Sequence, residues 1–542
     1  MDLLASLPPG VEPPKDVVSQ KVFINGTELN PEVALSQITV NKSFNKIAFA
    51  KMVFLDGSSS DQDFPLSNDD KFKPGSTIKV QLGYHGELDT VFEGIIVRHG
   101  IKIRPQGSAL LMIEAKDKAI KLTMTRKSAY HLGKKDSEVI EELAGELDHD
   151  VDPTKVTHDQ LVQYDATDWD FIVTRAEANG MLVLTDDGKL IVKKPSAQSP
   201  VVSFTYGTDI WELEAEMDAR RQVQEVSSIA WDFTKQKMPD PAITGEATFS
   251  EPGDISSDDL GAVLGAKIKL NHSGYLKEDQ LHTWSDAYAM RNKLSKASGR
   301  VRIEGKATLK PGDVVTLKGV GNRFNGNIFI TGILHHYEGH WQTDIQFGWR
   351  DEWFYKKENV MDKPAGGLLP GINGLQIGVV VTVKDEEKVG EFRVKVHVPT
   401  ITSGNKGIWA RVAALNAGKE RGSFFRPETG DEVVLGFLND DPRDPIILGY
   451  LHSKTEHASP LKDGDLQYGF VSKEKLKLIF DDKNQKLIVS VPGASGEKTI
   501  TLSKTAMELK DENQNSITMD TAGITIKAGK ILTLKGNVVK IN

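Results

Sequence analysis

Three histidines lie close together in the chain, at His335, His336 and His340. Imidazole nitrogens bind zinc when several ligands converge in a folded site, and a fourth donor would be needed beside these three. The histidines flank a Tyr-Glu-Gly turn between two apolar runs, a pattern that favours a strand hairpin with surface histidines. We therefore predict no metal site at this hairpin.

Two groups of acidic residues could bind a cation or act as an acid and base: Asp440, Asp441 and Asp444, and Asp165, Asp168 and Asp170. The first group alternates with prolines, which favours a solvated loop. The second group precedes a helical pattern, where carboxylates stabilise the first turn. Both groups are therefore interpreted as structural.

A glycine-containing segment, GVGNRFNG from Gly319, differs from a GxGxxG nucleotide-binding motif and is followed by no helical pattern, so it is predicted to be a turn. The chain shows no arrangement of nucleophile, base and orienting residue. We therefore predict no catalytic residues, no cofactor and no enzymatic activity.

Composition narrows the class of protein. The chain has 542 residues, a formal net charge of -9 and no cysteine. A length of this order allows three or more domains, and the acidic balance disfavours a nucleic-acid partner. Without cysteine there is no disulfide and no thiolate site. The N-terminus has no basic start and too short an apolar run for a signal peptide, and the apolar window from Gly371 is broken by glycine, as in a strand.

The N-terminal part is predicted to be mainly β. Residues 1–15 form a Pro-rich tail, 16–122 a first β-barrel, 123–198 a small α/β insert and 199–354 a second β-barrel. Within the insert we predict helices at 137–147 and 169–179, with Asp168 as the cap and Gly180 ending the second helix, followed by a hairpin at Asp187-Gly188. The polar stretch 233–280 is interpreted as surface loops, and a helix is predicted at 279–297.

An internal repeat supports two related barrels. FKPGSTIKVQL at Phe72 matches LKPGDVVTLKG at Leu309, and the segment from Val91 matches the segment from Ile328 after a one-residue shift. Pro-Gly turns before strands also recur by chance. Two matches in the same order favour duplication, and in a trimer two similar barrels per chain would form a pseudo-sixfold ring.

The C-terminal part begins with a linker at 355–373. Residues 374–452 contain five or six strand patterns, which fit an OB-type barrel. A second linker covers 453–470, and 471–542 are predicted to form a needle.

The needle prediction rests on apolar residues in i, i+2 pairs, broken every few residues by Gly, Asp or Asn. Both members of a pair lie on one face of a strand. The predicted inward residues are Leu476, Leu478, Phe480, Leu487, Val489, Val491, Ile500, Leu502, Met507, Leu509, Ile517, Met519, Ile524, Ile526, Leu532, Leu534, Val539 and Ile541.

From Ile500 these pairs recur mostly every seven or eight residues, about one third of the roughly twenty residues that one coil of a β-helix needs. Three identical chains, each forming one wall, would enclose a shared core, so we predict an intertwined, homotrimeric β-helix needle. The alternative is a small antiparallel meander at the end of a globular protein. The pattern argues against it, because hairpin pairs of matched length are not evident and aromatic residues are almost absent.

Four stretches together resemble the VgrG family of contractile-injection-system spikes, which are fusions equivalent to the hub and spike of phage tails. They are FRVKVHVP, GIWARVAAL, RPETGDEVVLGFLNDDPRDPIILGYLHS and the downstream repeat, with YDATDWDFIVTRAEANGMLVL resembling the hub insert. The resemblance covers nearly the whole chain. The short linker cannot hold the lysozyme domain of some family members, and no C-terminal effector extension is seen.

The resemblance implies a homotrimeric hub-and-spike protein at the tip of a contractile injection machine, of the extracellular-particle or type VI secretion type. Its implied partners are an inner tube ring, baseplate proteins, a PAAR-type cap on the tip at Val539, Ile541 and Asn542, and transiently a target membrane. It would be made and assembled in the bacterial cytoplasm and act in a secreted or extracellular particle. The alternatives are a glycan-binding or glycan-cleaving tailspike fibre, disfavoured because the needle has no Trp, and a toxin-bearing spike.

Overall fold

The computed structural model describes residues 17–541 except 106, 233, 234, 236, 239, 244–250, 273–275, 350, 351, 358, 362, 385–391, 403–405 and 459–465. The predicted tail at 1–15 and Asn542 lie outside the described residues. The chain divides into two compact units, Met1–Asp362 and Lys363–Asn542. A search of the described residues for a helix with the length and apolar character of a membrane span finds none.

The first unit begins with an antiparallel strand set whose alternating apolar residues bury one face. Its strands are β1 (Val18–Ile24), β2 (Thr27–Glu28), β3 (Leu35–Ser43), β4 (Phe49–Leu55), β5 (Thr77–Tyr84), β6 (Glu87–Lys102) and β7 (Leu110–Lys116). A short helix, α1 (Pro65–Asn68), lies between β4 and β5. The buried face includes Ile38, Met52, Phe92 and Leu111, which form one core.

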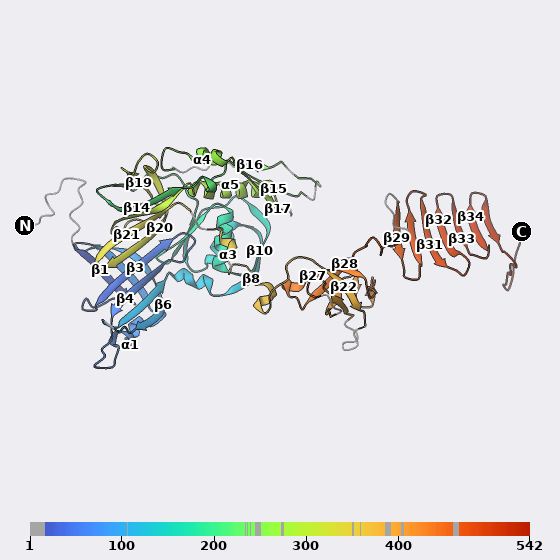
Figure 1. Ribbon diagram of the computed structural model, residues 1–542, viewed down its shortest axis with the longest axis horizontal. Helices are drawn as coiled ribbons and strands as arrows, with labels where there is room; N and C mark the ends of the chain where they lie inside the picture. The colour runs from blue at the N-terminus through green and yellow to red at the C-terminus, as the bar shows by residue number, and fades with distance from the viewer. Residues whose placement is uncertain are drawn as a thin grey trace, which may run out of the picture. The chain divides into compact units, whose positions relative to one another are not determined.

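A second strand set forms its own core around Val301, Ile330 and Ile345. Its strands are β13 (Val202–Thr205), β14 (Ile210–Met217), β18 (Ala297–Glu304), β19 (Val314–Lys318), β20 (Gly326–Glu338) and β21 (His340–Phe347). Pairing between β20 and β3 joins the two sets in one 13-stranded sheet (Figure 1). Since the two sets share this sheet, the expectation of two tandem β-barrels is not confirmed.

The repeated Pro-Gly turns have the same geometry. Gly75 and Gly312 have φ angles of 100° and 101°, a left-handed conformation that glycine adopts without a steric cost. Their amides donate to the carbonyl oxygens of Ile96 and Ile330, at 2.8 Å in each case. The strand pairing places Ile328 in the position of Gly94, because each lies opposite the second residue of the strand that follows the turn. The predicted alignment of Val91 with Ile328 is therefore wrong by three residues.

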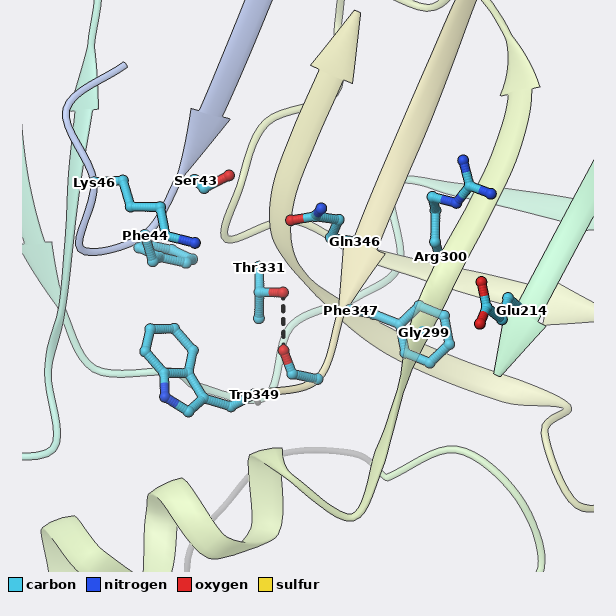
Figure 2. Close-up of a pocket in the computed structure, with 11 residues that line it drawn as sticks. Ser43, Phe44, Lys46, Glu214, Gly299, Arg300, Thr331, Gln346, Phe347 and Trp349 are labelled. Carbon is cyan, nitrogen blue, oxygen red and sulfur yellow. Dashed lines mark hydrogen bonds between the residues drawn. The ribbon is translucent and has the colours of Figure 1, made fainter. Parts of the chain in front are cut away.

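A cavity of about 330 Å³ lies where the two strand sets meet (Figure 2). Ser43 and Phe44 line it from the end of β3, and Thr331 lines it from a β-bulge in β20. The Thr331 hydroxyl donates to the carbonyl oxygen of Gly348 at 2.9 Å. This bond closes the bulge on the side away from β3. Beyond the bulge, β20 and β3 pair through six residue pairs, and this pairing is here called the seam.

The insert has the predicted α/β character. Its elements are β8 (Arg126–Lys135), α2 (Asp136–Ala144), β9 (Asp148–Val151), β10 (Thr157–Thr167), α3 (Asp168–Ala178), β11 (Leu182–Asp186) and β12 (Lys189–Lys193). The hairpin at Asp187-Gly188 is confirmed. The predicted cap of α3 is wrong: the Thr167 hydroxyl accepts from the Asp170 amide at 3.0 Å, so Thr167 is the cap and Asp168 begins the helix.

The polar stretch 233–280 was expected to be loops, and this is wrong in part. It contains β16 (Ala242–Ile243), α4 (Ser257–Leu264) and β17 (Lys267–His272), with β16 and β17 flanking β15 (Glu225–Ala230). Ser256 and Asp259 form a capping box at the start of α4. The helix predicted at 279–297 is present as α5 (Glu278–Leu294).

The second unit contains the predicted five-stranded barrel, closed in the order β22, β23, β24, β28, β27. The strands are β22 (Gln376–Thr382), β23 (Val394–His397), β24 (Ile408–Val412), β27 (Glu432–Phe437) and β28 (Pro445–Tyr450), with a short hairpin of β25 (Ala417–Gly418) and β26 (Arg421–Gly422). Val394, Val396, Val433, Leu435 and Ile447 fill the interior.

A seven-stranded sheet, here called the C-terminal sheet, follows the barrel. Its strands are β29 (Gln467–Val471), β30 (Lys477–Asp481), β31 (Lys486–Pro492), β32 (Glu497–Ser503), β33 (Ala506–Lys510), β34 (Ser516–Asp520) and β35 (Gly523–Lys527). Each strand pairs with the next in antiparallel orientation, so the strands lie side by side in chain order (Figure 1).

Candidate assembly surface

The C-terminal sheet carries apolar and polar residues on opposite faces. Most of its strands alternate, as in Thr499-Ile500-Thr501-Leu502, whereas β30 and β31 also carry Ile479 and Ile488 on the other face. β-Branched residues such as Ile and Thr favour extended backbone. Sharp turns separate the strands. One turn is closed by the Asp511 carboxylate, which accepts from the amides of Asn513 and Asn515 at 2.8 and 2.9 Å. Turns of this kind fix the register, so each strand presents the same face.

The register aligns the apolar pairs into two continuous rows across the sheet, here called the apolar ladders. One ladder runs through Tyr468, Phe480, Leu487, Leu502, Met507, Met519 and Ile524. The other runs through Phe470, Leu478, Val489, Ile500, Leu509, Ile517 and Ile526. At about 4.8 Å between strands, each ladder extends roughly 29 Å over seven strands.

Within the described chain the ladders remain open to solvent. Ile500 is 45% exposed, Leu509 42% and Ile524 67%, while core residues such as Val433 are 0% exposed. Large apolar side chains gathered in one exposed patch mark an interaction surface in a soluble protein. The opposite face carries mostly Lys, Thr, Ser and Glu, beside Ile479 and Ile488, with an ion pair between Lys477 and Glu497 at 2.9 Å. The polar face is therefore suited to solvent and the ladder face is not.

Twelve of the eighteen predicted needle residues lie in the ladders, and the other six do not. Val491 lies opposite Lys498, and Leu476 precedes β30. Leu532, Leu534, Val539 and Ile541 follow the last strand of the described chain and are exposed. Tyr468 and Phe470 belong to the ladders although the predicted needle began at residue 471. Their alternation around Gly469 was the signal that could have identified them.

The strand pairing corrects one expectation about this region. Hairpins of matched length are present: β31 and β32, for example, pair over seven residues each. Within one chain the strands thus form the antiparallel meander that was considered as the alternative. An isolated meander would still leave its apolar face in water, so the need for a covering surface remains.

His335 and His336 lie on β20, and His340 begins β21. The described residues contain no cluster of three or more His, Cys, Asp or Glu residues that could hold a metal ion. The interpretation of all three as surface histidines is wrong for His335, which is 3% exposed and has Nδ1 3.0 Å from the Thr343 hydroxyl. β3 pairs with β20 beside His335, and the His335 ring lies against the Trp341 ring, with 5.8 Å between the ring centroids. The turn at Gly339 joins β20 and β21 as predicted.

The buried His335 makes a pH-dependent contribution to stability. Burial, and to a smaller extent the nearby Lys42, together lower the pKa of His335 to about 3. As the pH falls below about 6.5, His335 therefore binds a proton in the unfolded chain but not in the folded protein. The free energy of unfolding then decreases until the pH reaches the pKa of His335 in the folded protein. We expect the free energy of unfolding of the first unit to decrease by about 3 kcal/mol between pH 7 and pH 4, and that of the His335→Asn variant to decrease less. Thermal melts over this pH range measure it; equal slopes in both proteins would contradict the assignment.

The acidic groups are structural in the residues described. Asp168 accepts from Gln163 Nε2 at 3.1 Å and from Lys127, and Asp168 and Asp170 occupy the first turn of α3 as predicted. Asp441 accepts from Arg443 at 2.6 Å in the loop that joins β27 and β28.

A buried polar cluster around Asp136, which the sequence analysis did not predict, lies in the insert. Asp136 is 1% exposed and accepts from His158 Nε2 at 2.8 Å, Arg175 Nε at 2.6 Å and Asn179 Nδ2 at 2.9 Å. Burial alone would raise the pKa of Asp136, but these donors hold it well below its usual range. Gln280 of α5 lies 2.9 Å from His158 Nδ1, so the cluster ties α5 to the insert.

Comparison with known proteins identifies both units. Residues 14–339 match the family described as Alg8 N-terminal domain, and residues 376–452 match the type VI secretion system/phage-baseplate injector OB domain. The second match contains the five-stranded barrel and confirms its OB type.

The relatives include the type VI secretion system spike protein VgrG3 of Vibrio cholerae serotype O1, 40% identical over 95 residues, which are 16% of this chain and 9% of the relative. The actin cross-linking toxin VgrG1 of another strain of this serotype is 38% identical over 96 residues, 17% of this chain and 8% of the relative. The chain thus matches less than a tenth of the length of these relatives. Among solved structures, the 43 kDa tail protein of prophage MuSo2 from Shewanella oneidensis aligns with a TM-score of 0.47 and 12% identity, over 61% of this chain and 98% of that protein.

A stretch of this chain, 95 residues long in the match to VgrG3, is thus homologous to part of the VgrG spike proteins, as the sequence resemblance predicted. The first match extends over more than half of the 542 residues and includes the first strand set, the insert and the second strand set except β21. The chain therefore belongs to the Alg8 N-terminal domain family and carries, later in the sequence, a type VI secretion system/phage-baseplate injector OB domain.

Proposed function

We propose that the protein is a homotrimeric hub-and-spike component of a contractile injection machine. The observation that carries the proposal is the pair of apolar ladders, open to solvent along the C-terminal sheet. Three copies can place their ladder faces against one another around a common axis, and each sheet then forms one wall of a three-sided needle. Burial of apolar side chains provides the driving force for this assembly.

The chemistry of the two faces supports a mechanical role. Ladder residues point to the axis, and the outer walls carry the Lys, Thr and Glu side chains of the polar face, among them Lys477 and Glu497. Backbone hydrogen bonds run from strand to strand along the needle, so an axial load is spread over the whole ladder. Such a needle transmits the force of contraction to a target envelope without breaking any covalent bond.

The first unit suits the hub. Its two strand sets follow the same order outward from β3 and from β14, and both contain the same Pro-Gly turn. Three copies of two similar sets give six similar elements, which can match a sixfold inner tube at one end and a threefold needle at the other. Inner-tube and baseplate proteins are therefore the proposed partners, together with a cap at the needle tip and transient contact with the target membrane.

Electron microscopy of the purified full chain tests this function. The expected image is a ring that carries a thin needle, with threefold symmetry in class averages. A compact particle without a needle would contradict it, since the exposed ladders would then be covered in some other way.

A further inference from the structure

The seam inside one chain predicts the contact between neighbouring copies, an inference that rests on the trimer of the proposed function. The first strand set runs in the order β3, β4, β7, β6, β5, and the second runs β14, β18, β21, β20, β19. In both, the fourth strand has a β-bulge at the same point, between Ile96 and Arg98 in β6 and between Ile330 and Gly332 in β20. The strands of the two sets therefore correspond residue by residue around these bulges.

The seam uses one edge from each set. Beyond its bulge, β20 pairs on one side with β21 and on the other with β3, from Gly332 opposite Ser43 to Tyr337 opposite Ile38. The corresponding edges are residues 98–103, which include the end of β6 and the residue that follows it, and the outer edge of β14. The structure gives neither edge a strand partner among the residues it describes: β6 pairs with β5 and β7, and β14 with β18.

The correspondence also fixes a register. In the first strand set, successive partners across the sheet are Ile96, Ala115, Ala50 and Val40. In the second strand set, the corresponding partners are Ile330, Phe347, Gly299 and Ala215. Val40 thus corresponds to Ala215. Copying the seam gives the antiparallel pairs Arg98 with Asp218, His99 with Met217, Gly100 with Glu216, Ile101 with Ala215, Lys102 with Glu214 and Ile103 with Leu213.

The side chains of these pairs are complementary. The register was transferred from the seam by backbone position alone, so it did not require this complementarity. On one face Lys102 meets Glu214, and Arg98 meets Asp218, which follows β14 and also accepts from Arg220. On the other face, Ile101 and Ile103 are 49% and 73% exposed in the single chain and meet Ala215 and Leu213, which pack on the core of the second strand set. Both edges thus turn their apolar residues toward the same side of the sheet. A one-residue slip would place Lys102 on an apolar partner.

We propose that β14 of each copy pairs with residues 98–103 of the next copy in this register, so that three copies close one continuous sheet around the hub. The edges are otherwise exposed strand edges, which bind other strands readily. The occupant is a second copy of this chain, because the template for the contact is the chain's own seam and the charges match.

Cysteine pairing tests the register directly, because the chain contains no cysteine. In the full-length Ile101→Cys/Ala215→Cys protein each copy contributes one cysteine to each of two contacts. Mild oxidation should therefore give a covalent trimer in a denaturing, non-reducing gel. The matched control, Ile101→Cys/Leu213→Cys, moves the second cysteine two residues along the same face, about 7 Å away and beyond disulfide reach. It should cross-link at least tenfold more slowly.

The outcomes separate this inference from the proposed function. A protein that is trimeric by native mass spectrometry but forms no covalent trimer, cross-links equally in both variants, or forms the disulfide within one copy overturns the pairing and leaves the needle trimer standing. A monomer overturns both. As a second readout, Lys102→Glu should weaken assembly of the trimer, and adding Glu214→Lys should restore it; failure of the double variant to recover also counts against the register.

Discussion

The Ile500→Asp variant is expected to be a monomer at micromolar concentration. Ile500 lies in the middle of one apolar ladder, between Val489 and Leu509. In a three-sided needle the substitution brings three carboxylates toward one axis with no cation near them. Leaving a buried charge without a partner costs several kcal/mol per group, more than the neighbouring apolar pairs can offset. Light scattering on the purified variant measures its mass.

The matched control is Thr499→Asp, one residue earlier in the same strand. Thr499 lies on the polar face opposite Lys510 and Ser490, so the added carboxylate meets a cation at the surface. This variant should keep the mass of the unsubstituted protein. An Ile500→Asp protein that stays trimeric, or a Thr499→Asp protein that dissociates, would show that the ladder face is not the interior.

The Asp136→Ala variant should destabilise the first unit by about 3–5 kcal/mol, or roughly 10 °C in melting temperature. The carboxylate is the common acceptor of His158, Arg175 and Asn179. Without it the Arg175 guanidinium loses its paired anion in a largely buried site. Differential scanning calorimetry measures the change. Asp159→Ala is the control, because Asp159 is an exposed partner of Lys277 and should change stability by about 0.5 kcal/mol or less.

The same carboxylate contributes to acid stability with a defined sign. Its pKa is depressed in the folded protein, so its contribution is fully present above the unfolded value of about 3.9 and is lost as the pH falls through the lower folded value. The difference in stability between the unsubstituted protein and Asp136→Ala should therefore shrink below about pH 4. A difference that stays constant down to pH 2 would show that the charge does not provide the stabilisation.

Short-range patterns predicted the elements well. The i, i+2 pairs from Leu478 to Ile526 identified the ladder residues, because the face of a strand depends only on its own alternation. Helix α5 and the OB-type barrel were also predicted from patterns within short segments of the sequence. Helix α4 was missed because its segment has few periodic apolar residues, although its Ser256–Asp259 capping box was visible in the sequence.

Long-range pairing was the part that local patterns could not supply. His335 was predicted to lie at the surface because nothing in the neighbouring sequence indicates that β3, far earlier in the chain, pairs with β20. The cluster around Asp136 joins residues from two helices and a strand, and no motif links them. The alignment of the repeat failed by three residues because the hairpin of β5 and β6 and the connection of β19 and β20 differ in length.

The mass of the protein in solution tests the central claim most directly. The ladders need a covering surface, and three copies of this chain supply one. Light scattering at micromolar concentration should therefore give about three times 59.7 kDa, independent of further dilution over the range where the protein stays folded. A folded particle of 59.7 kDa would contradict the account, because a single chain leaves both ladders in water.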